Sequence, residues 1–165
     1  MKSEEAIEEL RAIGWFDGLP PATTSTTLAA VQRKDQFDFE SLTSVRVDVD
    51  GCSSPEDYEA AIQQIAKQTA DAFSLRAREI RYSDDRITAE FDVDGHGVEC
   101  AFPQEDDWMS FEVIDAINSE LERQGRRFGL HALPVADSVA HFAITSEQAF
   151  RAAVERGLVP GGLDE

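Results

Sequence analysis

Apolar and polar residues alternate from Ile87 to Val93, and apolar residues return at every second position from Val98 to Phe102. Such alternation predicts the two antiparallel strands of a β-hairpin, with one face buried and the other in water. It constrains the fold strongly, because a slip of one residue would turn every apolar side chain into solvent. The acidic residues of the hairpin should therefore share its solvent face. These residues are Glu90, Asp92, Asp94 and Glu99.

The other periodic segments do not follow a strict βαβ rhythm. Further strands are predicted at 44–49, 78–82, 127–133 and 139–144. Helices are predicted at 4–13, at 110–123, in a segment that follows Ser54-Pro55, and in one that follows Ser146 and ends at Gly157. Mixed elements of this kind favour an α+β fold. We expect residues 1–165 to form a single domain, with a mostly antiparallel sheet of about five strands and three to four packed helices.

The two ends of the chain carry weaker patterns. Residues 15–27 contain a Pro-Pro pair and a run of Thr and Ser, which predicts a loop. Residues 28–42 are ambiguous and fit one short helix. We therefore expect residues 1–43 to form a helical N-terminal extension, and residues 158–165, which contain Pro160-Gly161-Gly162, to form a frayed tail.

Negative charge is concentrated in one part of the chain. Between Asp84 and Glu122 there are thirteen acids and one base, Arg86, in a chain whose net charge is −18. This excess disfavours nucleic acid and anionic membranes as direct partners, and favours a cationic protein. No apolar run approaches the roughly 18 residues of a membrane span, and the N-terminus lacks the apolar core of a signal peptide. With only two cysteines, these features predict a cytoplasmic protein.

Motifs for catalysis and metal binding are weak. Asp-Val-Asp-Gly occurs at 48–51 and at 92–95, but an EF-hand register lacks the closing glutamate in both places, and a strand that runs into an Asp-Gly turn accounts for the repeat. His131 and His141 can be neighbours on a hairpin, yet further zinc ligands are missing nearby. Neither a nucleophile elbow nor a phosphate-binding glycine loop occurs. We expect no catalytic residues, no metal and no cofactor, and hence a non-enzymatic protein.

Trp108 follows three consecutive acids and precedes the helix at 110–123. Two interpretations remain open: the indole packs the start of the helix onto the core, or it is an exposed anchor of a protein interface. Helical spacing turns Glu112 and Asp115 away from the core. The predicted partner-binding residues are Glu90, Asp92, Asp94, Glu99, Glu105, Asp106, Asp107, Trp108, Glu112 and Asp115.

The second half of the chain carries a resemblance to a known family. Asp107-Trp108 through Ile117-Asn118, then Arg127-Phe128, His141 to Ile144 and the last helix before Gly157-Leu158 resemble small immunity proteins of bacterial polymorphic and contact-dependent toxin systems. The resemblance implies a cytosolic, non-enzymatic antitoxin that blocks a cognate toxin by binding it directly. The acidic charge of the chain adds the expectation that this toxin is a basic protein, such as a secreted nuclease, which is neutralised by occlusion. The alternatives are an acidic or haloadapted soluble domain of unrelated role, and a small metal-independent enzyme.

Overall fold

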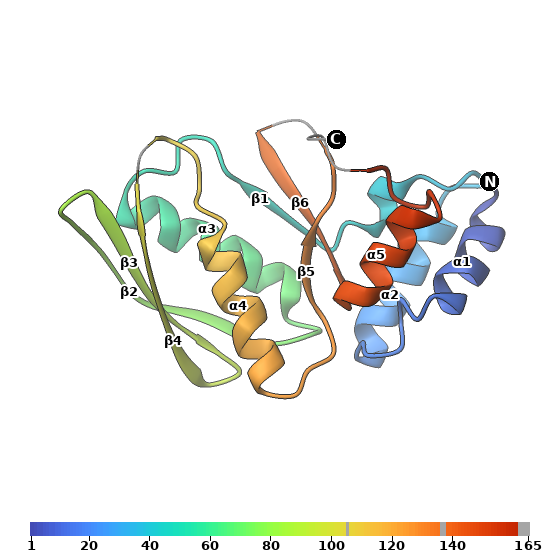
Figure 1. Cartoon of the computed structure of the whole chain (residues 1–165), viewed down its shortest axis with the longest axis horizontal. Coiled ribbons are helices and arrows are strands. Elements are labelled where there is room, and N and C mark those ends of the chain that lie inside the picture. Colours follow the sequence, from blue (N-terminus) through green and yellow to red (C-terminus); the bar gives the residue numbers. More distant parts are fainter. Residues whose placement is uncertain (105, 136–137, 162–165) are drawn as a thin grey trace.

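Six strands form two three-stranded antiparallel sheets, and helices lie between and beside them (Figure 1). The computed structural model describes residues 1–104, 106–135 and 138–161. The helices are α1 (Ser3–Ala12), α2 (Pro21–Gln32), the 3-10 helix η1 (Phe39–Leu42), α3 (Pro55–Thr69), α4 (Glu112–Arg123) and α5 (Glu147–Glu155). The strands are β1 (Val45–Asp48), β2 (Leu75–Ser83), β3 (Arg86–Val93), β4 (His96–Pro103), β5 (Gly129–Ala132) and β6 (Val139–Thr145).

The elements stack in four layers, as Figure 1 shows. The sheet β2-β3-β4 comes first, α3 and α4 form the second layer, the sheet β1-β6-β5 forms the third, and α5 with α1 and α2 forms the fourth. The α+β class is thus confirmed. The strands divide into two sheets because α3 carries the chain from β1 to β2, and α4 carries it back from β4 to β5. Both helices are therefore held between the sheets.

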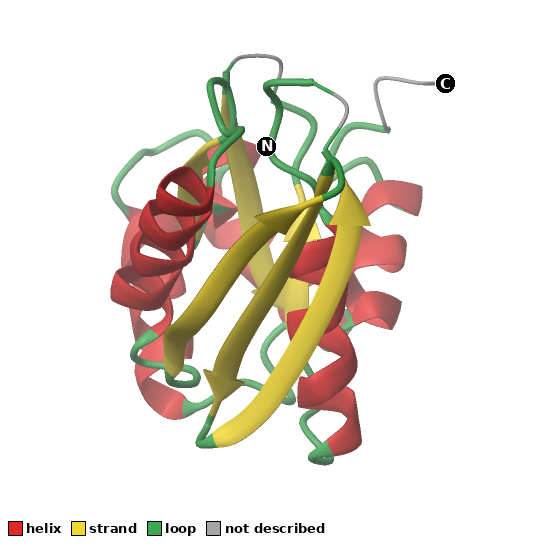
Figure 2. Ribbon diagram, turned by 90° about the vertical axis from the view of Figure 1, so that its left-hand side faces the viewer, coloured by secondary structure: helices red, strands yellow, loops and turns green. Residues whose placement is uncertain are grey.

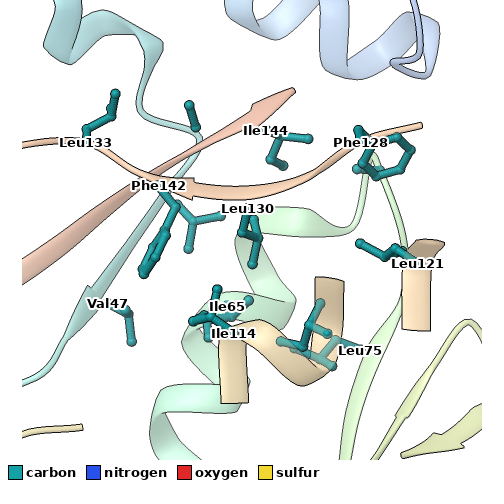
Figure 3. Packing of buried hydrophobic residues seen from close by; sticks show 14 of the residues in the cluster. Val47, Ile65, Leu75, Ile114, Leu121, Phe128, Leu130, Leu133, Phe142 and Ile144 are labelled. Atoms are coloured by element: carbon teal, nitrogen blue, oxygen red, sulfur yellow. The ribbon is translucent and has the colours of Figure 1, made fainter. Parts of the chain in front are cut away.

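One continuous core runs through these layers. Figure 3 shows Ile65 of α3 and Ile114 of α4 packed below Leu130 and Phe142 of the sheet β1-β6-β5. On the other side of the same helices, the inner face of β2-β3-β4 buries its own apolar residues. These are Ile87, Ala89, Phe91, Val93 and Phe102, none of which is exposed to solvent.

The hairpin and the third helix form as the sequence predicts. Val93 pairs with His96, so Asp94 and Gly95 alone make the turn, and both have positive φ. This two-residue loop matches the twist of the strands, which is why Asp-Gly is favoured there. At α3 the Ser54 side chain accepts from the Asp57 amide, and the Asp57 carboxylate accepts from the Ser54 amide in return, which forms a capping box.

The N-terminal expectation of a loop at 15–27 is wrong for its second half. Helix α2 begins at Pro21, and the buried Thr27 Oγ1 donates to the Thr23 carbonyl at 3.0 Å. That bond satisfies the hydroxyl of Thr27, whereas the buried hydroxyl of Thr23 has no hydrogen-bond partner within the described residues. The end of α2 falls in the segment 28–42, where one short helix is expected, and Leu10 and Trp15 join the N-terminal part of the chain to the common core.

The prediction of a frayed tail at 158–165 is also wrong for its first two residues. Leu158 and Val159 are buried, and the amides of both donate to the Ala153 carbonyl. The hydrophobic contribution of these two side chains outweighs the tendency of a Gly- and Pro-rich end to fray. Residues 162–165 lie outside the described part of the chain.

Candidate protein-binding surface

The outer face of β2-β3-β4 is open to solvent, and Figure 2 shows it turned toward the viewer without a covering helix. Glu90, Asp92 and Glu99 lie on this face, as the alternation predicts. Strand β2, however, places arginines beside them. Arg81 Nη1 lies 3.3 Å from Glu90 Oε1, and Arg78 Nη1 lies 3.6 Å from Asp92 Oδ1. The acids of the hairpin are therefore largely neutralised within the molecule.

Asp94 has a structural role at the other end of the hairpin. One carboxylate oxygen accepts from the Ser74 amide at 2.8 Å, and the other pairs with Arg126 Nη2 at 2.9 Å. This links the β3–β4 turn to the start of β2 and to the segment that follows α4. Glu99 remains exposed and stands directly opposite Glu90 across the ladder, an arrangement that disfavours the sheet unless a cation is near.

Beyond β4, Gln104 and Ser110 are held in place by a buried tyrosine. The Tyr58 hydroxyl donates to Gln104 Oε1 at 2.7 Å and accepts from the Ser110 amide at 2.9 Å. Gln104 Nε2 in turn donates to the Cys52 carbonyl at 3.1 Å. Burial raises the pKa of Tyr58 to about 12, so the hydroxyl keeps its proton at neutral pH. These contacts hold Gln104 and Ser110 against the start of α3.

Trp108 is 48% exposed, whereas its neighbour Met109 is 5% exposed and enters the core. The Trp108 amide donates to Asp106 Oδ1 at 2.9 Å, and the residue forms a β-bridge with Asp50. Met109 continues this pairing by donating its amide to the Val49 carbonyl at 2.9 Å. Of the two interpretations of Trp108, core packing is therefore wrong: the methionine takes the core position and the indole faces solvent.

Acidic residues from three segments lie at the end of the molecule that carries this indole. The Gln104 amide donates to the Asp85 carbonyl, which brings the β2–β3 turn to the same end of the molecule as Trp108. We call this surface the acidic end; it comprises Asp50, Asp84, Asp85, Asp106, Asp107 and Trp108. Within the described residues none of its carboxylates forms an ion pair. Glu105, which was predicted to belong to this group, lies outside the described part of the chain.

The predicted binding residues are thus brought to three places instead of one. Glu90, Asp92 and Glu99 lie on the outer sheet face, and Asp106, Asp107 and Trp108 lie at the acidic end. Glu112 and Asp115 are exposed on α4, which packs on the opposite side of β4. Asp115 lines a groove of about 900 Å³ between α4, β5 and α5.

Sequence reasoning missed the residues that set the charge and geometry of these surfaces. The arginines of β2 lie before the acidic segment in sequence, so counting charges along the chain does not register them. Three arginines, at 76, 78 and 81, stand in the strand predicted just before the hairpin or directly ahead of it. If that strand pairs with the hairpin, its arginines lie across from the acids, and this was the signal in the sequence for their neutralisation. Tyr58 and Gln104 left no comparable signal.

The two cysteine thiols are in their neutral form. Burial raises the pKa of both thiols, Cys52 and Cys100, to about 11, so they remain protonated and poorly nucleophilic at neutral pH. Within the described residues, no cluster of three His, Cys, Asp or Glu side chains could hold a metal ion. In that same part of the chain, every helix is too short or too polar to cross a membrane.

No protein-family model matches this sequence, and no curated protein and no solved structure matches it.

Proposed function

We propose that this chain is a non-enzymatic acidic binding protein that neutralises a basic protein by direct contact, as an immunity protein does for its cognate toxin in the cytoplasm of the producing cell. The observation that carries the proposal is the acidic end. A half-exposed indole is held in a fixed frame there, among carboxylates that form no ion pair with the described residues.

Such a surface fits a cationic protein for two physical reasons. Exposed tryptophans that are rigidly held are frequent energetic anchors of interfaces, because burying them releases much apolar surface at little entropic cost. Uncompensated carboxylates around the anchor attract a basic partner from a distance and orient it on approach. An arginine of the partner could also stack on the indole face.

The charge distribution favours a binding role over the alternative of an acidic domain whose charge serves solubility alone. Solubility requires only an even spread of acids. In this protein the sheet face mixes arginines with acids, as Arg78 and Arg81 show, whereas the carboxylates of the acidic end form no ion pair within the described residues. We therefore expect Asp106, Asp107 and Trp108 to contribute more to binding than Glu90, Asp92 or Asp94.

The test begins with the gene next to the one that encodes this chain. The proposal expects it to encode a large secreted protein with a toxic C-terminal domain, and expects this chain to restore growth when that domain is produced in the same cells. Absence of such a gene, or failure to restore growth with soluble protein present, contradicts the proposal.

Variants then test the surface by titration calorimetry with the purified toxin domain. Trp108→Ala should weaken binding by about 2 kcal/mol, the usual threshold of a hot spot. The double change Asp106→Asn/Asp107→Asn should weaken binding and flatten its salt dependence. The matched control is Glu5→Gln/Glu8→Gln, which removes the same charge from exposed positions of α1. If the two double variants weaken toxin binding equally, binding depends on the net charge of the protein and not on the acidic end.

A further inference from the structure

Residues 106–110 carry the exposed indole of the acidic end, and backbone hydrogen bonds join them to the core. The Cys52 amide donates to the Asp107 carbonyl at 2.7 Å, and the Met109 amide donates to the Val49 carbonyl at 2.9 Å. Cys52 and Val49 are both buried and belong to the connection between β1 and α3. The backbone around the indole is therefore attached to buried residues of another segment.

The side chain of Gln104 adds a further attachment. Its Nε2 lies within hydrogen-bonding distance of three carbonyl oxygens: those of Cys52 at 3.1 Å, of Trp108 at 3.4 Å and of Asp106. Its Oε1 accepts from the Tyr58 hydroxyl at 2.7 Å. One carboxamide thus links the segment that carries the indole to a residue of α3, through its donor on one side and its acceptor on the other.

Tyr58 is fully buried in α3, and its hydroxyl acts as both donor and acceptor. The hydroxyl donates to Gln104 and accepts from the Ser110 amide at 2.9 Å. Because Gln104 precedes Trp108 and Ser110 follows it, a single hydroxyl holds the chain on both sides of the indole. The ring of Tyr58 packs on that of Phe102, with 5.2 Å between the centroids. A phenylalanine at position 58 would therefore keep this packing and lose only the attachment.

Holding an exposed indole in place is unfavourable for the free protein. Trp108 is 48% exposed, and the neighbouring core position is filled by Met109, which is 5% exposed. Ordering a surface segment costs conformational entropy, and a half-exposed side chain recovers little of it through burial. A partner that meets an indole already in place does not bear that cost, so its affinity is higher. The buried attachment of an exposed aromatic residue therefore favours a role in binding.

We propose that Tyr58 is a positioning residue for partner binding: it lies too deep to touch the partner, and it acts through Gln104 and Ser110, which keep Trp108 in its binding conformation. The inference rests on the proposed function for its partner. It also has a kinetic consequence. When only a fraction of the molecules present the indole in place, the association rate falls by that fraction. The contacts within the complex are retained, and so is its dissociation rate.

The first measurement uses the full chain without a partner. Tyr58→Phe is compared with Thr69→Val, which removes another fully buried hydroxyl from α3, one that donates to the Ile65 carbonyl at 2.9 Å. NMR relaxation gives the order parameters of the two indole N–H groups, and buried Trp15 is the internal reference. Tyr58→Phe should lower the value for Trp108 from about 0.85, typical of a rigid group, to below about 0.6, whereas Thr69→Val should not. A mobile Trp108 in the wild type, or no change in Tyr58→Phe, would overturn the proposal.

The second measurement follows the kinetics of binding to the toxin domain. Tyr58→Phe should lower the association rate constant roughly tenfold and leave the dissociation rate constant within about twofold of the wild-type value. Trp108→Ala removes a contact, so it should act mainly on dissociation. In a Trp108→Ala background Tyr58→Phe should have no further effect, because the residue it positions is gone. An equal loss in both backgrounds, or an effect on dissociation alone, would show a merely structural role. Thr69→Val should leave both rate constants unchanged.

A second variant and the wild type separate the possible failures. Gln104→Leu removes the link and keeps Tyr58, so it should reproduce both results if the tyrosine acts through this carboxamide. A wild-type chain that does not bind the toxin domain contradicts the proposed function, and the order parameters still decide whether Tyr58 holds the indole. Wild-type binding that Tyr58→Phe leaves unaffected contradicts the positioning role alone.

Discussion

At the scale of single residues, Asn118 and Gly129 depend on each other. The Asn118 carboxamide can reach both backbone groups of Leu130 only because the preceding residue has no side chain. A Cβ at position 129 would lie 2.8 Å from Asn118 Oδ1 and 3.1 Å from its Cγ. The glycine is thus required by the close approach of a side chain to the strand.

Gly129→Ala should therefore displace Asn118 and lose both hydrogen bonds. We expect the free energy of unfolding to fall by roughly 1–3 kcal/mol, the range for two such bonds. Urea denaturation measures this loss in the free energy of unfolding. Gly97→Ala is the control, because a Cβ at position 97 meets no atom closer than 3.4 Å. In an Asn118→Ala background the same glycine substitution should cost much less; an equal cost would contradict the coupling.

His131 should make the fold sensitive to mild acid. Its ring stacks on Phe150 at 5.3 Å, and burial lowers its pKa although the Thr145 backbone and Glu147 act in the opposite direction. Because the folded pKa lies below the value of about 6.5 in the unfolded chain, the unfolded state binds the proton first as pH falls. The neutral His131 ring therefore makes its full contribution to the free energy of unfolding above about pH 6.5, and this contribution is lost progressively as the pH falls below that value.

We therefore expect the free energy of unfolding of the wild-type chain to decline from pH 7.5 to pH 5.5 more steeply than that of His131→Gln. Urea denaturation at the two pH values makes the comparison. His96→Gln serves as control, since His96 is exposed and should leave the wild-type decline intact. Identical declines for wild type and His131→Gln would show that burial of this ring does not bias its protonation.

At the scale of elements, the two edges of the sheet β1-β6-β5 are closed by side-chain amides. Gln68 of α3 accepts from the Arg46 amide at 2.8 Å and donates to its carbonyl at 2.7 Å, and Gln64 accepts from the Asp48 amide at 3.1 Å. Asn118 does the same for β5. Carboxamides carry both a donor and an acceptor, so they take the place of a neighbouring strand and protect the edges from pairing with other chains.

Gln68→Ala should open the edge of β1. The two bonds to Arg46 predict a loss of roughly 1–3 kcal/mol in the free energy of unfolding, and faster hydrogen exchange of the Arg46 amide. Gln63→Ala is the matched control on the same helix, since Gln63 reaches only Glu59, at 3.4 Å. Unchanged exchange at Arg46 in the Gln68 variant would contradict the edge-closing role.

Elements with strong periodicity could be predicted from the sequence. The alternation at 87–93 and the cap at Ser54 each determine a local geometry, because burial of one face and satisfaction of the first helical amides are local requirements. The first part of helix α2 could not be predicted, since its Thr and Ser residues favour loops until Thr23 and Thr27 are buried by tertiary packing. The division into two sheets depends on long-range pairing of β1 with β6, which no local pattern encodes.

At the scale of the whole molecule, the position of charge in space differs from its position in sequence. The exposure of the acids could be predicted from alternation and helical spacing, but their neutralisation could not, because Arg78 and Arg81 come from another strand. The exposure of Trp108 depends on Met109, which occupies the neighbouring core position. The exposure of the acids was thus predictable residue by residue, whereas the grouping of these residues into surfaces was not.

A net charge of −18 should make thermal stability increase with salt. Screening weakens surface ion pairs such as Arg81–Glu90, but it weakens the larger self-repulsion more. We expect the melting temperature to rise by a few degrees between about 20 mM and about 500 mM NaCl, measured by calorimetry. Asp106→Asn/Asp107→Asn should reduce the rise, whereas a fall in melting temperature would show that the ion pairs dominate.

The pairing of β1 with β6 also has a consequence for synthesis on the ribosome. Val45 pairs with Phe142, so β1 emerges roughly a hundred residues before its neighbouring strand exists. At about 5–20 residues per second, β1 waits for roughly 5–20 s. Gln64 and Gln68 follow within the next 22 residues, but they close the other edge of β1, at Arg46 and Asp48. The edge that pairs with β6 therefore stays open until Phe142 has been made, and is exposed to pairing with other chains in the meantime.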